Sequence, residues 1–199
     1  MASPGDEFFG QRVLGIDEAG RGPLAGPVVA AGVMLDQRHH IIGLKDSKKL
    51  TKLAREDLYE EIMERALFVS VKAVDNRTID RINILQATLL AMKEVILAFN
   101  PKEAMDAVLI DGNQTVSGIS HFKQYALVNG DNRHPNIMAA SIIAKVRRDQ
   151  LMMSCHEQFP DYGFDSHKGY GTELHLQAIA RLGPCPIHRL SFAPFKDTE

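Results

Sequence analysis

The sequence has 199 residues, the length of one ordinary domain or of one domain with a short appendage. Hydrophobic residues make up 45% of the chain and charged residues 24%, which excludes the composition of an intrinsically disordered protein. The formal net charge of −2 excludes a basic field over the whole molecule, so any contact with a nucleic acid has to be local.

The chain begins with a predicted pair of strands. A β-prone run over residues 12–16 stops at a turn rich in glycine and proline, residues 17–23, so Asp17 and Glu18 are expected in a loop. Residues 28–35 are rich in Val and Ala and too short for a typical helix, which predicts a second buried strand. The two strands are expected to form a hairpin-like pair.

Two helices and a third strand follow. After a loop over residues 44–50, Thr51 is a favourable N-cap for a helix that runs to about Ala66, and residues 67–74 predict a strand. The next helix ends at Asn100-Pro101 and is indicated by apolar residues at alternating spacings of three and four. These residues are Ile82, Leu85, Leu89, Met92, Ile96 and Phe99.

The second half predicts two short strands and two further helices. Residues 107–110 and 125–128 are apolar runs that end near an acid. A long helix is expected to start at Pro135, and a last one after the Thr172 cap. Strands that alternate with helices in this way predict an α/β fold with a mixed sheet.

Features of export or membrane insertion are not expected. The N-terminal sequence lacks the basic and apolar regions of a signal peptide, and no run of about 18 apolar residues predicts a membrane span. The two cysteines, Cys155 and Cys185, form neither a disulfide framework nor a zinc-ligand pattern. We therefore expect a cytoplasmic protein.

Four acids fall near the carboxyl ends of predicted strands, where α/β sheets place their ligands. They are Asp17, Glu18, Asp111 and Asp131. If they converge, their mutual repulsion requires protonation or a divalent cation, and an all-oxygen site favours Mg²⁺ or Mn²⁺. A pair of such ions suits phosphodiester hydrolysis. For any single acid, a turn or cap role is the simpler explanation.

The run Asp17-Glu18-Ala19-Gly20-Arg21-Gly22-Pro23-Leu24 resembles the N-terminal signature of the ribonuclease HII family, the type 2 ribonucleases H. Further blocks continue the resemblance in the family's order over nearly the whole chain. They are Asp46-Ser47-Lys48-Lys49-Leu50, Ile82-Asn83, Leu109-Ile110-Asp111-Gly112, Gly130-Asp131, Ala139 to Val146 with Arg148-Asp149, His167-Lys168-Gly169-Tyr170, and His188-Arg189 with Ser191-Phe192.

The resemblance implies a ribonuclease H-like fold, with a five-stranded mixed sheet flanked by helices and a small helical C-terminal part. We expect a catalytic domain over residues 1–159 and a C-terminal extension over residues 160–199. The family's activity implies hydrolysis of the RNA strand of RNA/DNA hybrids. It also implies a cut on the 5′ side of single ribonucleotides in duplex DNA, leaving a 3′-hydroxyl and a 5′-phosphate, as in ribonucleotide excision repair. A monomer is expected.

By the same resemblance, the catalytic and metal-binding acids are Asp17, Glu18, Asp111 and Asp131. Asp131 has Asp149 as its rival, because Asp149 is also an acid in a matching block, although a structural role is preferred for it. We expect two divalent ions, Mg²⁺ or Mn²⁺, during catalysis.

The turn at Gly20-Arg21-Gly22 is expected to read the ribose, because glycine lets main chain approach a sugar and backbone groups pair with a 2′-hydroxyl. Arg21 alternatively pairs with an acid. Tyr170, between two glycines, is expected to be exposed as a platform for a sugar ring. Positions that match the family's phosphate contacts are Lys45, Asn83, Ser141 and Lys145; for Lys45 a solvated surface is the alternative.

Two other functions stay open at this stage. One is a nuclease or transposase-like enzyme on the same fold, which would not need a 2′-hydroxyl reader. The other is a non-catalytic module that binds hybrids, which would not need all four acids. His134 and His167 are candidates for proton shuttles, and the Phe192-Ala193-Pro194-Phe195 tail is expected to pack on the protein rather than to dock on a partner.

Overall fold

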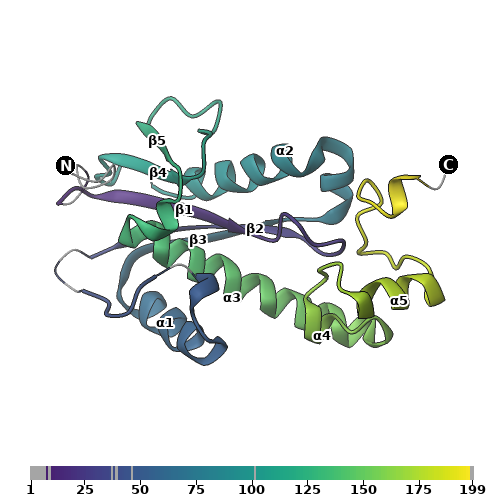
Figure 1. Ribbon diagram of the computed structural model, residues 1–199. Helices are drawn as coiled ribbons and strands as arrows, with labels where there is room; N and C mark the ends of the chain where they lie inside the picture. Colours follow the sequence, from purple (N-terminus) through teal and green to yellow (C-terminus); the bar gives the residue numbers. More distant parts are fainter. Residues whose placement is uncertain are drawn as a thin grey trace.

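A computed structural model describes residues 8, 10–36, 38, 40–45, 47–100 and 102–197, and its centre is a five-stranded sheet in the order β3-β2-β1-β4-β5 (Figure 1). The strands are β1 Val13–Ala19, β2 Val28–Leu35, β3 Ala66–Val74, β4 Ala107–Asp111 and β5 Gln124–Leu127. β1, β2 and β3 are antiparallel neighbours, whereas β4 is parallel to both β1 and β5. The predicted mixed sheet is confirmed.

Helices cover both faces of the sheet. The α-helices are α1 Lys52–Arg65, α2 Asn76–Leu97, α3 Pro135–Gln158, α4 Phe164–His167 and α5 Glu173–Leu182. Short 3-10 turns are η2 Ser47–Lys49, η3 Gly130–Asn132, η4 Pro160–Tyr162 and η5 Phe195–Asp197. Figure 1 shows α2 on one face of the sheet and α1 with α3 on the other.

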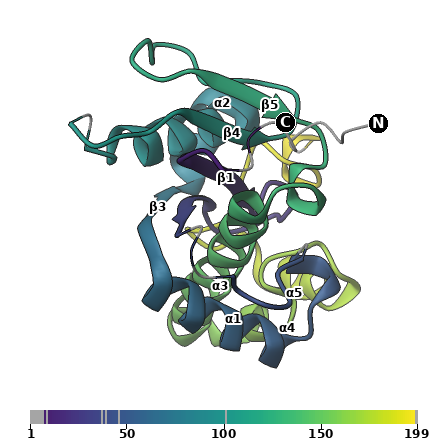
Figure 2. The same cartoon turned by 90° about the vertical axis from the view of Figure 1, so that its left-hand side faces the viewer.

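The two hydrophobic layers follow from the side-chain alternation of the strands. On one face, Leu14 and Ile16 of β1 pack with Val95 of α2 in one apolar cluster. On the other face, Ala31 and Val33 of β2 belong to a second cluster with residues of α3 and α1. In the turned view of Figure 2, α3 lies between β1 and α1.

The first strand is longer than the sequence predicted. β1 continues to Ala19, so that Asp17 and Glu18 are strand residues rather than loop residues, and the prediction of a strand ending at residue 16 is wrong. The reason lies in the partner strand, because Asp17 pairs with Ala31 and Glu18 with Ala30. Two acids can thus continue a strand when its neighbour supplies the ladder bonds.

Helix α2 begins before its apolar stripe. The Asp75 side chain accepts a hydrogen bond from the Thr78 amide at 2.8 Å and caps a first turn. The helix is then interrupted at Asn83, whose φ is 67°, and the Asn83 side chain accepts from the Gln86 amide at 3.1 Å. The predicted stripe therefore starts close to the internal kink rather than at the helix start.

The chain after α3 packs against the end of that helix. Met152 of α3 shares an apolar cluster with Tyr162, Phe164, Ala178 and Cys185. The short helix α4 was not predicted; left-handed residues at Gly163 and Lys168 bound it. We propose that residues 160–199 form an extension packed on a catalytic domain of residues 1–159. Within these two ranges, residues 1–7, 9, 37, 39, 46, 101, 198 and 199 lie outside the described part.

The C-terminal tail also packs on the body of the protein. The centre of the Phe192 ring lies 5.1 Å from the guanidinium carbon of Arg189. The centres of the Phe195 and His188 rings are 5.3 Å apart. Asp80 of α2 accepts hydrogen bonds from the Leu190 and Ser191 amides. Across the described residues, no helix is both long and apolar enough to cross a membrane.

Candidate active site

Three carboxylates meet where β1 and β4 end. Ile16 and Ile110 are partners in the parallel ladder, so the residues that follow them, Asp17 and Asp111, lie side by side. Asp131 joins them from η3, and oxygen atoms of the three side chains all lie within 4.8 Å of one another. The predicted convergence holds for these three acids.

Backbone amides hold this cluster in place. The Asp111 Oδ1 atom accepts from the Gly130 amide at 2.7 Å, which fixes the η3 turn beside β4. Asn129 enters that turn in the left-handed conformation, and a Cβ atom at Gly130 would lie 2.6 Å from the Ile137 Cδ1 atom. The turn, rather than β5 itself, therefore brings Asp131 to the other acids.

The electrostatics of the cluster favour a cation. Burial, and then the charges of Glu18 and Asp111, raise the pKa of Asp17 well above its ordinary value. Burial, and then the charge of Asp131, raise the pKa of Asp111. A divalent ion removes this repulsion, and a donor set made only of carboxylate oxygens fits hard ions such as Mg²⁺ or Mn²⁺.

Glu18 lies beside the three-carboxylate cluster but is not one of its members. Its Oε1 atom is 3.5 Å from the Arg21 Nη1 atom, and its side chain is 15% exposed. Burial raises the pKa of Glu18, while the Arg21 charge opposes that shift. Arg21 thus pairs with an acid, which was the alternative role that the sequence allowed for it. Of the four acids expected to converge, three form the cluster and Glu18 lies next to it.

Ser141 is placed differently from a phosphate contact. It is buried in α3, its Oγ atom is 2.9 Å from the Ser47 Oγ atom, and it forms a hydrogen bond with Asp17 that lowers the pKa of that acid. Ser47, from η2, was given no role in the sequence analysis. The only signal for it was its place in the matching block that begins at Asp46, a residue outside the described part.

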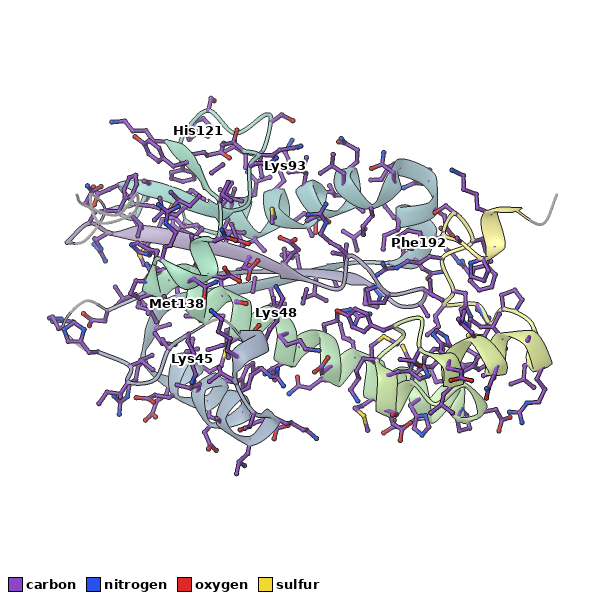
Figure 3. The ribbon with its side chains drawn as sticks, viewed as in Figure 1. Lys45, Lys48, Lys93, His121, Met138 and Phe192 are labelled. Carbon is purple, nitrogen blue, oxygen red and sulfur yellow. The ribbon has the colours of Figure 1, made fainter. Side chains whose placement is uncertain are left out.

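The remaining predicted phosphate contacts come from separate parts of the chain. Lys45 is exposed, and Figure 3 shows it in the segment before α1, with Lys48 nearer to the sheet in this view. The charge of Lys48 lowers the pKa of both Glu18 and Asp111, so Lys48 belongs to the site although it was not predicted. Asn83 is exposed at the kink of α2.

Lys145 forms an ion pair with Asp149 one turn later in α3. The Nζ and Oδ1 atoms are 2.6 Å apart, and each side chain is about a quarter exposed, at 23% and 25%. Asp149 is not one of the three clustered acids. The geometry therefore favours Asp131 over Asp149 as a metal ligand.

The turn of residues 20–22 faces Tyr170. The Tyr170 side chain is 44% exposed, as predicted. A Cβ atom built on Gly22 would lie 3.9 Å from the Tyr170 Cε1 atom and meets nothing closer. A methyl group on Gly22 would thus touch the tyrosine ring without crowding it.

The two candidate proton shuttles are both hydrogen-bonded to the main chain. Burial lowers the pKa of His134 to about 4, and its Nδ1 atom accepts the Asn136 amide at the start of α3. Burial also lowers the pKa of His167, whose Nε2 atom is 2.8 Å from the Tyr162 carbonyl oxygen. Both rings serve as hydrogen-bonding groups of the scaffold.

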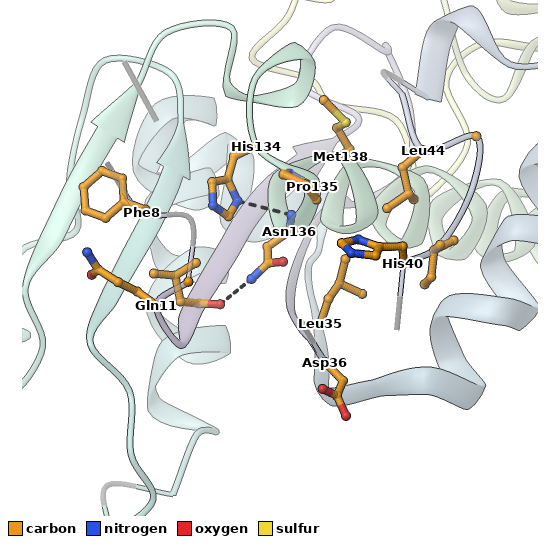
Figure 4. Close-up of a pocket in the computed structure, with 14 residues that line it drawn as sticks. Phe8, Gln11, Leu35, Asp36, His40, Leu44, His134, Pro135, Asn136 and Met138 are labelled. Atoms are coloured by element: carbon orange, nitrogen blue, oxygen red, sulfur yellow. Dashed lines mark hydrogen bonds between the residues drawn. The ribbon is translucent and has the colours of Figure 1, made fainter. Parts of the chain in front are cut away.

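A separate cavity of about 430 Å³ lies toward the other end of β1 (Figure 4). Val13, His40, His134 and Met138 are among its lining residues, but none of the three clustered acids is. Two of its lining residues are joined by a hydrogen bond, which Asn136 donates to the Val13 carbonyl at 2.6 Å. The cavity is therefore distinct from the carboxylate site.

Substitution of the two rival acids separates their roles. Asp131→Asn is expected to lower the hydrolysis that the resemblance implies by about a hundredfold or more, since the loss of one carboxylate from a cluster that would hold the ion removes several kcal/mol of transition-state stabilisation. Asp149→Asn breaks only the pair with Lys145 and is expected to cost less than about threefold. Rates at saturating Mg²⁺ test this, and an Asp149→Asn loss larger than that of Asp131→Asn would reverse the assignment.

Comparison with known proteins gives one consistent family. The family model described as Ribonuclease HII matches residues 14–195. A ribonuclease HII of Endomicrobium trichonymphae is 53% identical over 185 residues, which cover 93% of this chain and 87% of that protein.

Solved structures agree in fold. The ribonuclease HII of Archaeoglobus fulgidus, solved in a complex with PCNA, has a TM-score of 0.77 at 28% identity, over 91% of this chain and 95% of that one. Bst-RNase HIII, solved in complex with Mn²⁺, has a TM-score of 0.73 at 22% identity, over 94% of this chain and 68% of that one. At that identity the second likeness supports the fold alone.

Proposed function

Because this chain belongs to the ribonuclease HII family, the metal-dependent ribonucleases that hydrolyse the RNA strand of RNA/DNA hybrids, we propose a more specific activity for it. It is an endoribonuclease that also cuts duplex DNA on the 5′ side of a single embedded ribonucleotide and leaves a 3′-hydroxyl and a 5′-phosphate. It acts as a monomer in the cytoplasm. The observation that carries this proposal is the cluster of Asp17, Asp111 and Asp131, and the turn that follows Asp17 along the chain comes close to Tyr170 at Gly22.

The acids would hold the ions, and their neighbours would keep the acids in place. Two divalent ions, Mg²⁺ or Mn²⁺, supply the Lewis acidity that activates water and stabilises the leaving oxygen of a phosphodiester. Asp17, Asp111 and Asp131 are the proposed ligands, with Glu18 at the border of the site. Ser141 keeps the Asp17 carboxylate turned toward its partners through the hydrogen bond between them.

Recognition of the ribose is assigned to the turn of residues 20–22. Main-chain groups pair with a 2′-hydroxyl as donor or acceptor, and the absence of a Cβ atom at Gly22 leaves room for the sugar. Tyr170 then packs on the sugar of the next nucleotide. Because an added hydroxyl would crowd the ring, junctions from RNA to DNA are the preferred substrate.

Phosphate contacts are assigned to lysine side chains and to the neutral amide of Asn83. Lys45, Lys48 and Asn83 are exposed, and Lys145 would exchange its Asp149 partner for a phosphate oxygen. The same exchange is not open to Ser141, which is 4% exposed. We therefore assign to Ser141 the holding of Asp17 rather than a phosphate.

Cleavage of three duplexes with one sequence tests the proposed activity. The first is all DNA, the second carries one ribonucleotide, and the third pairs an RNA strand with DNA. We expect cuts in the second and third only, with the 5′ product of the second ending in a 3′-hydroxyl. Equal cutting of all-DNA duplex would indicate a nuclease of another substrate class, and binding without cutting would indicate a hybrid-binding module.

Gly22→Ala tests the ribose reading without unfolding the protein. Gly22 lacks the left-handed φ that would strain alanine, and the nearest atom to the new methyl group is 3.9 Å away. We expect the melting temperature to change by less than about 2 °C. Cleavage at a single ribonucleotide is expected to fall by tenfold or more, because the methyl group occupies the space for the sugar. Unchanged cleavage would contradict this use of the turn.

A further inference from the structure

Two arginine side chains are buried in the interior beside the turn of residues 20–22. Arg148 is 1% exposed and Arg189 is 0% exposed, and they are the two largest fully buried side chains among the described residues. In the part of the chain that the structure describes, neither guanidinium lies within ion-pair distance of a carboxylate. A buried charge without an ionic partner is costly unless other polar groups solvate it.

Carbonyl oxygens solvate Arg189. Its guanidinium donates to the carbonyl oxygens of Gly20 at 2.6 Å, Arg21 at 2.9 Å and Gly26 at 3.0 Å. Burial, and then the charge of Arg148, lower the pKa of Arg189 to about 9, so the group is still cationic at neutral pH. One planar group thus holds both ends of the loop between β1 and β2.

These bonds also fix the direction of two amides. In a trans peptide the C=O and N–H groups point in opposite directions, so holding the Gly20 and Arg21 carbonyls aims the Arg21 and Gly22 amides away from Arg189. Neither amide donates a hydrogen bond to any residue that the structure describes. Two oriented donors therefore remain for a ligand at the turn.

Arg148 links the same loop to Tyr170. It donates to the carbonyl oxygens of Pro27 at 3.2 Å, Ala25 at 3.2 Å and Lys168 at 3.0 Å. Its guanidinium carbon lies 5.7 Å from the centre of the Tyr170 ring. The group thus connects residues 25 and 27, at the far end of the loop, with the segment that carries the tyrosine, and it also lies against Gly20 of the turn.

Gly20 and Gly22 have different reasons to be glycine. A Cβ atom on Gly20 would lie 2.0 Å from the Arg148 Nε atom, and Gly20 has a φ of +97°. A Cβ atom on Gly22, by contrast, would meet only the Tyr170 Cε1 atom, at the ordinary van der Waals distance of 3.9 Å. The first glycine therefore makes room for the buried arginine, and only the second leaves room for a sugar.

We propose that Arg189 and Arg148 are positioning residues for ribose recognition. Arg189 orients the Arg21 and Gly22 amides toward the 2′-hydroxyl, and Arg148 sets the distance between that turn and Tyr170. The proposal rests on the proposed function, since it presumes that the turn of residues 20–22 reads the ribose. Lysine has neither the planar fork nor the number of donors to replace either group.

Binding to two matched duplexes tests this role. Fluorescence anisotropy at low ionic strength, without divalent ions, gives Kd for an all-DNA duplex and for the same duplex with one ribonucleotide. The ratio of the two Kd values measures ribose discrimination. Arg189→Lys and Arg148→Lys are compared with a control, Arg147→Lys, which changes an exposed arginine next to Arg148 in α3.

For the parent and Arg147→Lys we expect the same ratio, and for the other two variants a ratio about tenfold smaller with little change in Kd for all-DNA duplex. A purely structural role would weaken both duplexes equally, so that result, or an unchanged ratio, would overturn the proposal. A parent without ribose discrimination would instead overturn the proposed function, and this inference with it.

A second variant covers the case in which a lysine variant does not fold. In Gly20→Ala the new methyl group would lie 2.0 Å from the Arg148 Nε atom and 2.9 Å from the Pro27 carbonyl oxygen, so it displaces Arg148 and one of its acceptors, and the ratio is expected to fall as in Arg148→Lys. A folded Gly20→Ala protein with the full parent ratio would overturn the role of Arg148.

Discussion

Asp17→Asn is expected to lower hydrolysis by about a thousandfold and, without divalent ions, to raise the melting temperature. The first effect follows because Asp17 is a proposed ligand, and about 4 kcal/mol of lost transition-state stabilisation corresponds to three decades in rate. The second follows because the buried carboxylate lies beside Asp111 and Glu18. An amide has no charge to desolvate there.

The raised pKa of Asp17 determines the sign of the stability change in Asp17→Asn. The folded-state pKa of Asp17 is raised above its unfolded value, so the folded protein binds this proton more tightly. The stability contributed by this group is present below the unfolded pKa and is lost as the pH rises through the folded pKa. At neutral pH the metal-free parent carries that cost, and Asp17→Asn does not.

Thermal melts at pH 7 with increasing Mg²⁺ or Mn²⁺ check both statements. Ions that bind only the folded protein raise the parent's melting temperature, and the rise is expected to be much smaller for Asp17→Asn. Asp57→Asn, which changes an exposed acid of α1, is the matched control and should follow the parent. A variant that is inactive but gains as much from the ions as the parent would show that Asp17 acts on the substrate instead.

Glu18→Gln separates the border of the site from its centre. Its activity is expected to fall sharply as well, because its carboxylate lies near Asp17 and Asp111. Its thermal response to the ions is expected to stay closer to that of the parent, since Glu18 is outside the three-carboxylate cluster. The same melts measure this difference.

Elements with local signals were predicted well. β2 has the predicted bounds, and the caps at Thr51 and Thr172 both accept the expected amide hydrogen bonds. The end of β1 was missed because its pairing partners are Ala30 and Ala31, whose effect on Asp17 and Glu18 is not local. A strand boundary set by a neighbouring strand cannot be found from the residues of that strand alone.

The site divides in the same way. Residue types and the order of the matching blocks predicted the acids, of which Asp17, Asp111 and Asp131 lie together, and they also predicted the glycine turn and Tyr170. The roles of Ser47, Arg148 and Arg189 depend on contacts between residues distant in sequence, such as the bond from Arg189 to Gly20, 169 residues earlier. A sequence shows that an arginine is present, but not that carbonyl oxygens surround it.

Tyr170→Ala is expected to lower cleavage at a single ribonucleotide by about a hundredfold, whereas Tyr170→Phe should keep most of the activity. The ring is exposed, and its segment is fixed by the hydrogen bond from the Leu24 amide to the Gly169 carbonyl at 2.8 Å. The ring is therefore carried by an anchored segment and lies beside Gly22. If it places the sugar, a shift of the scissile phosphate by about 1 Å can cost on the order of a hundredfold.

Comparison of two substrates makes this prediction specific to Tyr170 as a sugar platform. On a uniform RNA/DNA hybrid the next sugar also carries a 2′-hydroxyl, which crowds the ring, so the alanine variant is expected to lose less activity there. Phenylalanine keeps the packing surface and the contact with Arg148, because the proposed role does not use the hydroxyl group. Rates at saturating metal on both substrates decide the matter. An alanine variant as active as the parent on the single-ribonucleotide duplex would leave Tyr170 with only its packing against Arg148.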